Sequence, residues 1–140
     1  MITGIAHAAI LVHDLDESLD FYCGKLGLKE AFRLDRDGKV WLVYLQIKGT
    51  TFIELFPGGE KKVVDNRPGP PHLCLEVDDI EQTLADLKSR GLEITGAARQ
   101  GTDGNYQYWI YDPDGTKIEL MQLMPGSMQL KAVEALEARG

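Results

Sequence analysis

The chain has 140 residues, of which 44% are hydrophobic, enough to build the core of one ordinary domain or of two small units. Its 22 acidic residues outnumber its 15 lysines and arginines, which gives a formal net charge of −7 at pH 7. Since nucleic acids and anionic membranes are bound by basic patches, neither is expected as a partner. The first residues lack the pattern of a signal peptide, and no apolar run is long enough to span a bilayer, so we expect a cytoplasmic protein.

The first part of the chain predicts a strand, a helix and three further strands. Residues 4–12 are nearly all apolar and predict a strand in which His7 is the only polar side chain. Asp14, followed by Glu17 three residues later, is a capping-box pattern, and apolar residues at helical spacing continue until Gly27. The three further strands are expected at residues 29–34, 39–47 and 51–56.

A segment rich in proline separates this unit from a second one. Residues 57–71 contain four prolines and are expected to form a linker: Pro57, Pro68, Pro70 and Pro71. Residues 72–77 then predict a strand, and Asp79 with Gln82 forms a second capping box before a helix that ends at Gly91. Further strands are expected at residues 92–97, 106–111 and 117–123.

The chain closes with a predicted helix, and its two cysteines are too few for a disulfide framework. Ser127 can cap this helix, which is expected to pack on its own subunit or on a partner subunit. Its partly apolar stripe consists of Met128, Val133 and Leu136. We expect Cys23 and Cys74 to be reduced thiols.

Two histidines and two glutamates recur at equal spacing. Glu54 follows His7, and Glu119 follows His72, by 47 positions in each case. A shift of 65 positions places His7 on His72, and the same shift superposes the capping aspartates and several apolar residues of the two units. The sequence therefore predicts one β-α-β-β-β unit written twice.

Both glutamates lie in the middle of apolar strands, where a lone carboxylate is costly to bury. Taken singly, each of the four residues is more simply a core histidine or a glutamate on a hydrated face. Together they form a set of two imidazoles and two carboxylates, which first-row divalent metals accept with positions left open for water or substrate. The alternative is a copy that retained these residues without activity.

These features resemble the vicinal oxygen chelate superfamily from residue 4 to residue 123. The resemblance rests on residues 4–7, 19–28, 72–79 and 112–119. It implies an α+β fold in which paired β-α-β-β-β units form a cupped, eight-stranded mixed sheet around a metal, usually in a homodimer. Residues 1–140 would then form a single domain made of a first unit at 4–56, a second unit at 72–123 and a C-terminal helix at 127–140.

Within that superfamily the four filled positions are similar to those of glyoxalase I, a lactoylglutathione lyase. The resemblance implies that His7, Glu54, His72 and Glu119 bind a divalent metal ion such as Ni, Co, Zn or Mn. It also implies proton transfer through a metal-stabilised enediolate of a small carbonyl substrate, with Glu119 as the principal base and Glu54 as its counterpart on the opposite face.

The substrate and several other activities stay open. Bacterial glyoxalase I has an Arg and an Asn that contact glutathione, and this chain has Leu11 and Gly58 at those places. An enzyme similar to methylmalonyl-CoA epimerase is one alternative. A ring-cleaving dioxygenase and a non-catalytic protein that binds small molecules with the same fold are the others.

Overall fold

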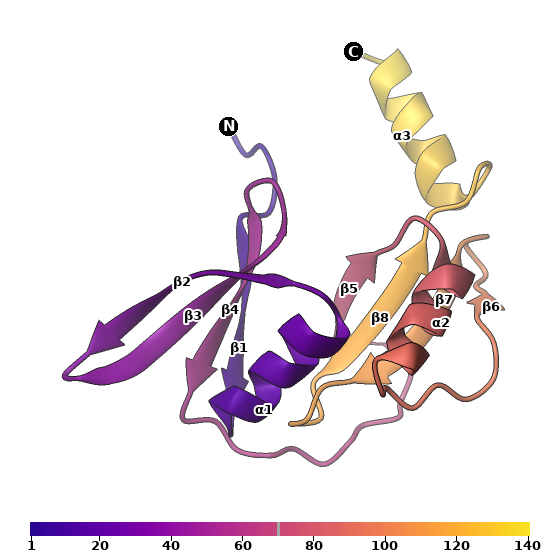
Figure 1. The fold of residues 1–140 in the computed structure, drawn as a ribbon. Coiled ribbons are helices and arrows are strands. Elements are labelled where there is room, and N and C mark those ends of the chain that lie inside the picture. Colours follow the sequence, from indigo (N-terminus) through magenta and orange to yellow (C-terminus); the bar gives the residue numbers. More distant parts are fainter. Residues whose placement is uncertain (70) are drawn as a thin grey trace. The chain divides into compact units, whose positions relative to one another are not determined.

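The computed structural model describes residues 1–69 and 71–140, so Pro70 of the predicted linker lies outside the described residues. The chain divides into two compact units: residues 1–64 with 112–116, and residues 65–111 with 117–140. Each unit contains a four-stranded mixed sheet (Figure 1). The predicted α+β class is thereby confirmed.

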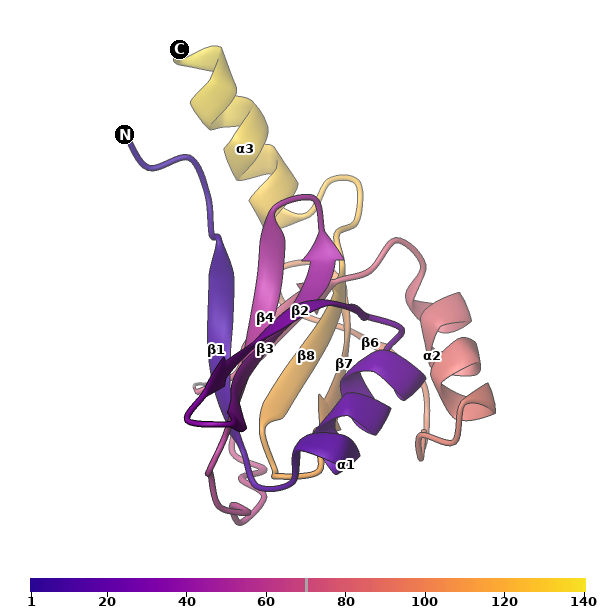
Figure 2. The ribbon, with the colours of Figure 1, turned by 60° about the vertical axis from the view of Figure 1, so that its left-hand side comes forward.

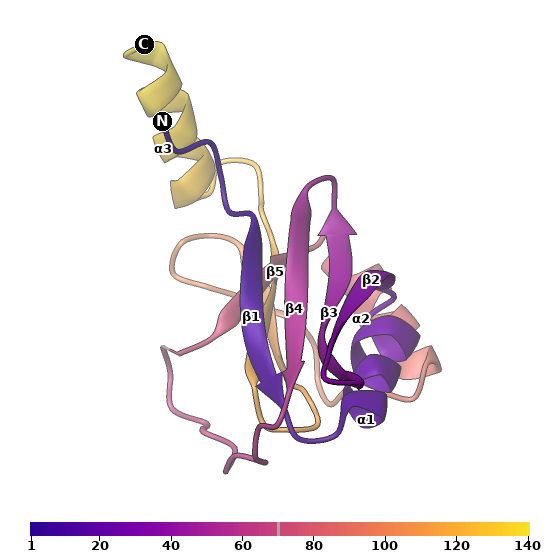
Figure 3. The ribbon, with the colours of Figure 1, turned by 90° about the vertical axis from the view of Figure 1, so that its left-hand side faces the viewer.

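The first unit has the predicted order of elements. They are β1 (His7–Val12), α1 (Leu15–Leu19), η1 (Asp20–Lys25), β2 (Lys29–Arg36), β3 (Lys39–Lys48) and β4 (Thr51–Pro57). The strand order in the sheet is β1-β4-β3-β2 (Figure 3). Strand β1 is parallel to β4, whereas β4 with β3 and β3 with β2 are antiparallel.

The second unit repeats this arrangement. Its elements are β5 (Leu73–Glu76), α2 (Ile80–Ser89), β6 (Arg99–Gln100), β7 (Tyr106–Tyr111), β8 (Lys117–Gln122) and α3 (Met128–Ala138). The strand order is β5-β8-β7-β6, again with one parallel pair, β5 and β8, and antiparallel neighbours. The first strand of each unit therefore lies beside the last strand of that unit, which is where the histidines and glutamates are.

The predicted helix starts are confirmed by their capping hydrogen bonds. The Asp14 carboxylate accepts from the backbone N–H of Glu17 at 2.9 Å, and the Asp79 carboxylate accepts from the N–H of Gln82 at 3.0 Å. The first helix reaches the predicted end near Gly27, but its second half, η1, is a π-helix. Such wide turns are rare in proteins, and the sequence pattern does not distinguish them from an α-helix.

The prediction of a strand at residues 92–97 is wrong. The edge of the sheet is formed instead by the two-residue strand β6. The hydroxyl of Tyr108 accepts from the backbone N–H of Thr95 and donates to the Thr95 carbonyl, both at 2.9 Å. A side chain therefore satisfies the backbone groups that a strand neighbour would otherwise bind. Gly96 follows with a φ of 76°, which turns the chain away from extended geometry.

The two faces of each sheet differ in character. In the first unit, Ile10 pairs with Leu55, and Leu55 pairs with Val43, which places three buried apolar side chains on one face. The helical segment α1–η1 lies along this sheet (Figure 2). In the second unit α2 packs against β7 and β8, and the pair Leu120 and Ile118 is buried on the corresponding face. The other face of each sheet carries a candidate glutamate, Glu54 in the first unit and Glu119 in the second.

The C-terminal helix α3 is capped as predicted by Ser127, whose hydroxyl accepts from the backbone N–H of Leu130 at 3.4 Å. None of its residues is buried, and the three members of the predicted apolar stripe are exposed. Its second residue, Gln129, bonds to Asp103 and Asn105 of the preceding loop at 2.8 Å each. Within residues 1–69 and 71–140 no helix is long and apolar enough to cross a membrane.

Candidate active site

The first unit brings His7 and Glu54 together. Strand β1 pairs with β4 so that Ala9 lies opposite Glu54, and His7, two residues earlier, is on the same face. The His7 Nε2 atom is 3.1 Å from Glu54 Oε2. Glu54 is 6% exposed, whereas the His7 side chain is 45% exposed, so the buried carboxylate has an imidazole between it and solvent.

The second unit brings His72 and Glu119 together in the same way. Cys74 lies opposite Glu119 in the pairing of β5 with β8, and the His72 Nε2 atom is 3.1 Å from Glu119 Oε2. Glu119 is 5% exposed. The other ring nitrogen of His72 is 3.3 Å from the carbonyl oxygen of Gly69, which orients the imidazole. The repeat seen in the sequence is therefore a repeat of side-chain geometry.

An aromatic side chain on the third strand flanks each pair. Tyr44 lies opposite Glu54, and the hydrogen bond to that carboxylate raises the pKa of the Tyr44 hydroxyl above its usual range. Its ring stacks on Phe32 with centroids 4.3 Å apart. Trp109 lies opposite Glu119, and its ring meets the His72 imidazole edge-on at a centroid distance of 4.9 Å.

Cys74 is the other neighbour of Glu119. Burial, followed by the charge and hydrogen bonding of Glu119, raises the pKa of the Cys74 thiol to about 12. The thiol is therefore protonated at neutral pH and acts as a donor rather than a nucleophile. Both cysteines are free, as expected for reduced thiols.

The sequence analysis missed these flanking residues, although a signal for them was present. The shift of 65 positions that superposes the histidines also places Tyr44 on Trp109 and Ala9 on Cys74. Trp109 is more than a strand-packing residue, because its ring contacts the His72 imidazole. Extending the repeat from the four candidate ligands to their strand neighbours identifies both aromatic side chains.

The residues of both pairs suit a divalent cation. Each pair offers one imidazole nitrogen and one carboxylate, the donors that first-row metals accept. Among the described residues, no Lys or Arg lies within 4.0 Å of either buried carboxylate. A buried carboxylate is costly unless a cation or several donors compensate it. Since no Lys or Arg among the described residues compensates either carboxylate, a bound cation could do so.

The convergence of all four side chains on one cation stays a prediction, because each pair belongs to a different unit. In the part of the chain that the structure describes, no single group of three or more His, Cys, Asp or Glu side chains could hold a metal ion.

Leu11 stands where the resemblance to bacterial glyoxalase I would place an Arg that contacts glutathione. It lies in β1 on the same face as His7 and Ala9, and its side chain is exposed.

Comparisons with known proteins agree with this architecture. A family model described as the Glyoxalase/Bleomycin resistance protein/Dioxygenase superfamily matches residues 4–120. A probable lactoylglutathione lyase of Synechocystis sp. is 32% identical over 125 residues, which span 84% of this chain and 94% of that protein. The mitochondrial methylmalonyl-CoA epimerase of Homo sapiens is 29% identical over 127 residues, 83% of this chain and 72% of that protein. The crystal structure of the glyoxalase family protein from Enterococcus faecalis has a TM-score of 0.68 and 27% identity, and the match covers 84% of this chain and 96% of that one.

Proposed function

The chain belongs to the Glyoxalase/Bleomycin resistance protein/Dioxygenase superfamily, and we propose that it is a metal-dependent lyase or isomerase of the glyoxalase I type. The observation that carries the proposal is the pair of equivalent half-sites, each with a buried glutamate 3.1 Å from an imidazole. His7, Glu54, His72 and Glu119 would hold a divalent ion such as Ni, Co, Zn or Mn. When bound, that ion would supply positive charge to the substrate oxygens on which negative charge develops.

The chain's own contribution to the reaction is proton transfer by a carboxylate. Glu119 takes the proton from the hydroxyl-bearing carbon next to the substrate carbonyl, and the electron pair of the broken C–H bond moves toward the carbonyl to form an enediolate. Glu119 then delivers the proton to the former carbonyl carbon, while the carbon that lost the proton becomes the new carbonyl. Its low exposure limits competition from water for that proton. His72 is 3.1 Å from this carboxylate and holds it in place. Glu54 is the counterpart for a proton on the opposite face.

The substrate is proposed to be a small carbonyl compound. The relative described as a probable lactoylglutathione lyase supports a lyase, although Leu11 and Gly58 replace the residues that would contact glutathione. The second candidate, an enzyme similar to methylmalonyl-CoA epimerase, is supported by the human relative of that name. Both candidates use the same proton transfer next to a carbonyl group.

We further propose a cytoplasmic homodimer. Two free thiols suit a reducing compartment. The exposed apolar residues of α3 offer surface for association. A monomer that is independent of concentration in sedimentation velocity would contradict the dimer.

Metal content tests the proposed function before any substrate is known. Purified protein, dialysed against each candidate metal and then against buffer, is expected to retain divalent metal. His7→Ala and His72→Ala should each weaken that binding by about 10-fold or more, because each removes a nitrogen ligand. His13→Ala is the matched control, since His13 bonds to Gly59 rather than to either glutamate. Protein that binds no divalent metal, with both variants unchanged, would refute the catalytic proposal.

A further inference from the structure

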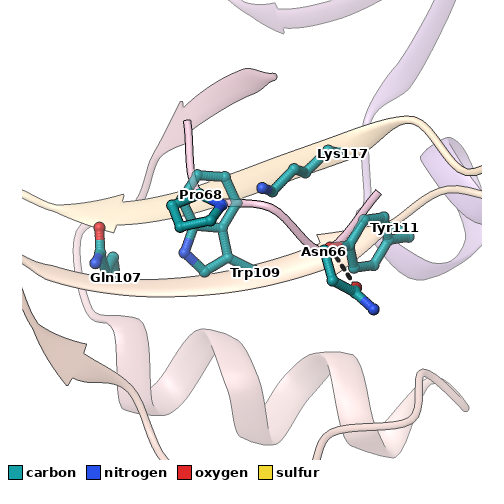
Figure 4. Close-up of a pocket in the computed structure, with 6 residues that line it drawn as sticks. All are labelled: Asn66, Pro68, Gln107, Trp109, Tyr111 and Lys117. Atoms are coloured by element: carbon teal, nitrogen blue, oxygen red, sulfur yellow. Dashed lines mark hydrogen bonds between the residues drawn. The ribbon is translucent and has the colours of Figure 1, made fainter. Parts of the chain in front are cut away.

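The second unit contains a cavity of about 450 Å³ that is lined in part by Trp109, the residue whose ring contacts the His72 imidazole. Six residues line it (Figure 4): Asn66, Pro68, Gln107, Trp109, Tyr111 and Lys117. This volume is in the range of small-molecule sites. Four of the six come from β7 and β8, and the other two come from the segment that the sequence analysis treated as a linker.

Lys117 supplies the positive charge of this cavity. Its ammonium lies 4.6 Å from the centroid of the Trp109 ring and donates a hydrogen bond to the backbone carbonyl of Arg67. An ammonium has three donors, so one bond to a carbonyl leaves two for a ligand. Among the described residues no carboxylate lies within 4.0 Å of this ammonium. The acidic neighbour is Asp65, which Arg67 binds through Nε and Nη2. Hydrogen bonds from Arg67, and to a smaller extent the charge of Lys117, lower the pKa of the Asp65 carboxyl.

The other lining residues include a hydrogen-bonded pair and an aromatic ring. The Tyr111 hydroxyl donates to the Asn66 side-chain oxygen at 3.0 Å, which ties the linker residue to strand β7. Figure 4 shows Pro68 beside the Trp109 ring and the Lys117 side chain pointing toward that ring. Trp109 thus contributes an aromatic surface while Lys117 contributes the charge.

We propose that this cavity binds the carboxylate group of the substrate, with Lys117 as its ion-pair partner and the Trp109 ring against the adjoining flat part of the molecule. The substrate of the proposed reaction would then be a small carbonyl acid rather than an uncharged aldehyde or ketone. This assignment of a substrate class rests on the proposed function, whereas the binding of the anion does not.

The position of Trp109 links the cavity to the reacting group. The centroid of its ring lies 4.9 Å from the centroid of the His72 imidazole and 4.6 Å from the Lys117 ammonium. Lys117 also stands two residues before Glu119 in β8, so both side chains lie on the same face of the sheet. In the proposed complex, a carboxylate bound to Lys117 directs the neighbouring carbonyl carbon toward the His72–Glu119 pair. Binding energy from a part of the substrate that does not react can in this way orient the part that does.

The internal repeat indicates that Lys117 is a specific feature of the second unit. The shift of 65 positions that relates the two half-sites places Phe52 at the position of Lys117. The Phe52 ring packs against Tyr44, with centroids 5.8 Å apart. The two half-sites share the His, the Glu and an aromatic residue, but the cation occurs in one of them. The positive charge that would bind the substrate carboxylate therefore comes from the second unit.

A carboxylate fits this arrangement better than a phosphate. Phosphate sites typically use a guanidinium fork or several donors at once. Two guanidinium groups lie nearby, but neither lines this cavity: Arg67 is already bound by Asp65, and Arg99 lines a neighbouring cavity that shares Gln107 and Trp109 with this one. A single ammonium above an aromatic ring instead suits a small, singly charged acid.

The test uses metal-free protein, so that it does not depend on the proposed reaction. The probe is benzoylformate, which has a carboxylate, an adjacent carbonyl and a flat ring, and its neutral methyl ester is the matched ligand. The chain has two tryptophans, so the indole N–H signal of Trp109 in an NMR titration reports binding at the cavity and that of Trp41 is the internal control. We expect the acid to shift the Trp109 signal and to bind at least about 10-fold more tightly than the ester, which corresponds to about 1.4 kcal/mol.

Substitutions then separate recognition from folding. Lys117→Met keeps a side chain of similar length but removes the charge, so acid binding should fall about 10-fold to the level of the ester, while ester binding and the melting temperature stay unchanged. Lys117→Arg should retain the preference for the acid. Lys88→Met, in α2 and outside the cavity, should change neither affinity.

Four outcomes would overturn the proposal. They are equal binding of acid and ester by the wild type, binding of the acid weaker than about 10 mM, equal weakening of both ligands by Lys117→Met, and tighter binding of phenyl phosphate than of benzoylformate. The last of these would make the ligand a phosphate. If the acid binds as expected but the protein holds no metal, the proposed function fails and the anion site stands.

Discussion

Replacement of Glu119 by Gln separates the role of the base from that of the ligand. The side chain is 5% exposed and its nearest ionic partner is the His72 imidazole at 3.1 Å, so the isosteric amide fits the same space. Glu119→Gln retains an oxygen that can still bind a metal but removes the negative charge that accepts the proton. We therefore expect metal affinity to fall modestly and turnover to fall much further.

The size of the loss follows from the chemistry of the position. Loss of a general base typically costs a factor of about 10² to 10⁴, which corresponds to about 2.7–5.5 kcal/mol of transition-state stabilisation. The equivalent Glu54, 6% exposed in the same geometry, provides the internal comparison. If Glu119 is the principal base, Glu54→Gln should lose less exchange. Glu81→Gln, on the exposed face of α2, is the surface control.

The assay is incorporation of solvent deuterium at the carbon next to the carbonyl, measured by NMR on metal-loaded protein. The substrates are hemithioacetals of glutathione and of other thiols, 2-methylmalonyl thioesters, and small carbonyl acids. The wild type should exchange this hydrogen, and Glu119→Gln should lose exchange far more than it loses metal. Exchange that survives in Glu119→Gln would refute the assignment of the base. Strong activity on the glutathione adduct would show that Leu11 and Gly58 do not exclude glutathione.

Three further predictions concern stability. Tyr22→Phe should lower the free energy of unfolding by about 1–3 kcal/mol in urea titrations, because it removes a buried hydrogen bond of 2.8 Å to Asp112; an unchanged midpoint would contradict this. Gly115→Ala should cost about 1 kcal/mol or more in the same assay, since Gly115 has a φ of 83° and an added Cβ would lie 2.9 Å from a backbone oxygen. Hydrogen bonds, first from the Gln129 amide, hold the pKa of Asp103 below its ordinary value, so its contribution is present above that ordinary pKa and is lost as pH falls through the lower folded pKa. Asp103→Asn should remove this acid dependence in an NMR titration of the α3 signals, and an identical titration in both proteins would disprove it.

Much of the fold was determined by local patterns in the sequence. The two capping boxes place helix starts because Asp14 and Asp79 bind backbone groups three residues away. Alternation of apolar residues predicts seven of the eight strands, since each strand must bury one face. The repeat also identified His7, Glu54, His72 and Glu119 as one set of candidate ligands, and the structure places them in two equivalent His–Glu pairs. Equal spacing in a duplicated unit leads to equal register between its first and last strands.

Other features depended on contacts between residues that are distant in the sequence. The strand expected at 92–97 does not form because the Tyr108 hydroxyl binds both backbone groups of Thr95, which no local pattern reveals. Trp109 and Lys117 become one site only when β7 pairs with β8 and a residue of the linker, Pro68, closes the cavity beside them. Local sequence patterns indicate which segments form strands and which form helices. The register of strands and the packing of a loop decide which side chains share a face, because those depend on the whole buried surface and on every backbone hydrogen bond at once.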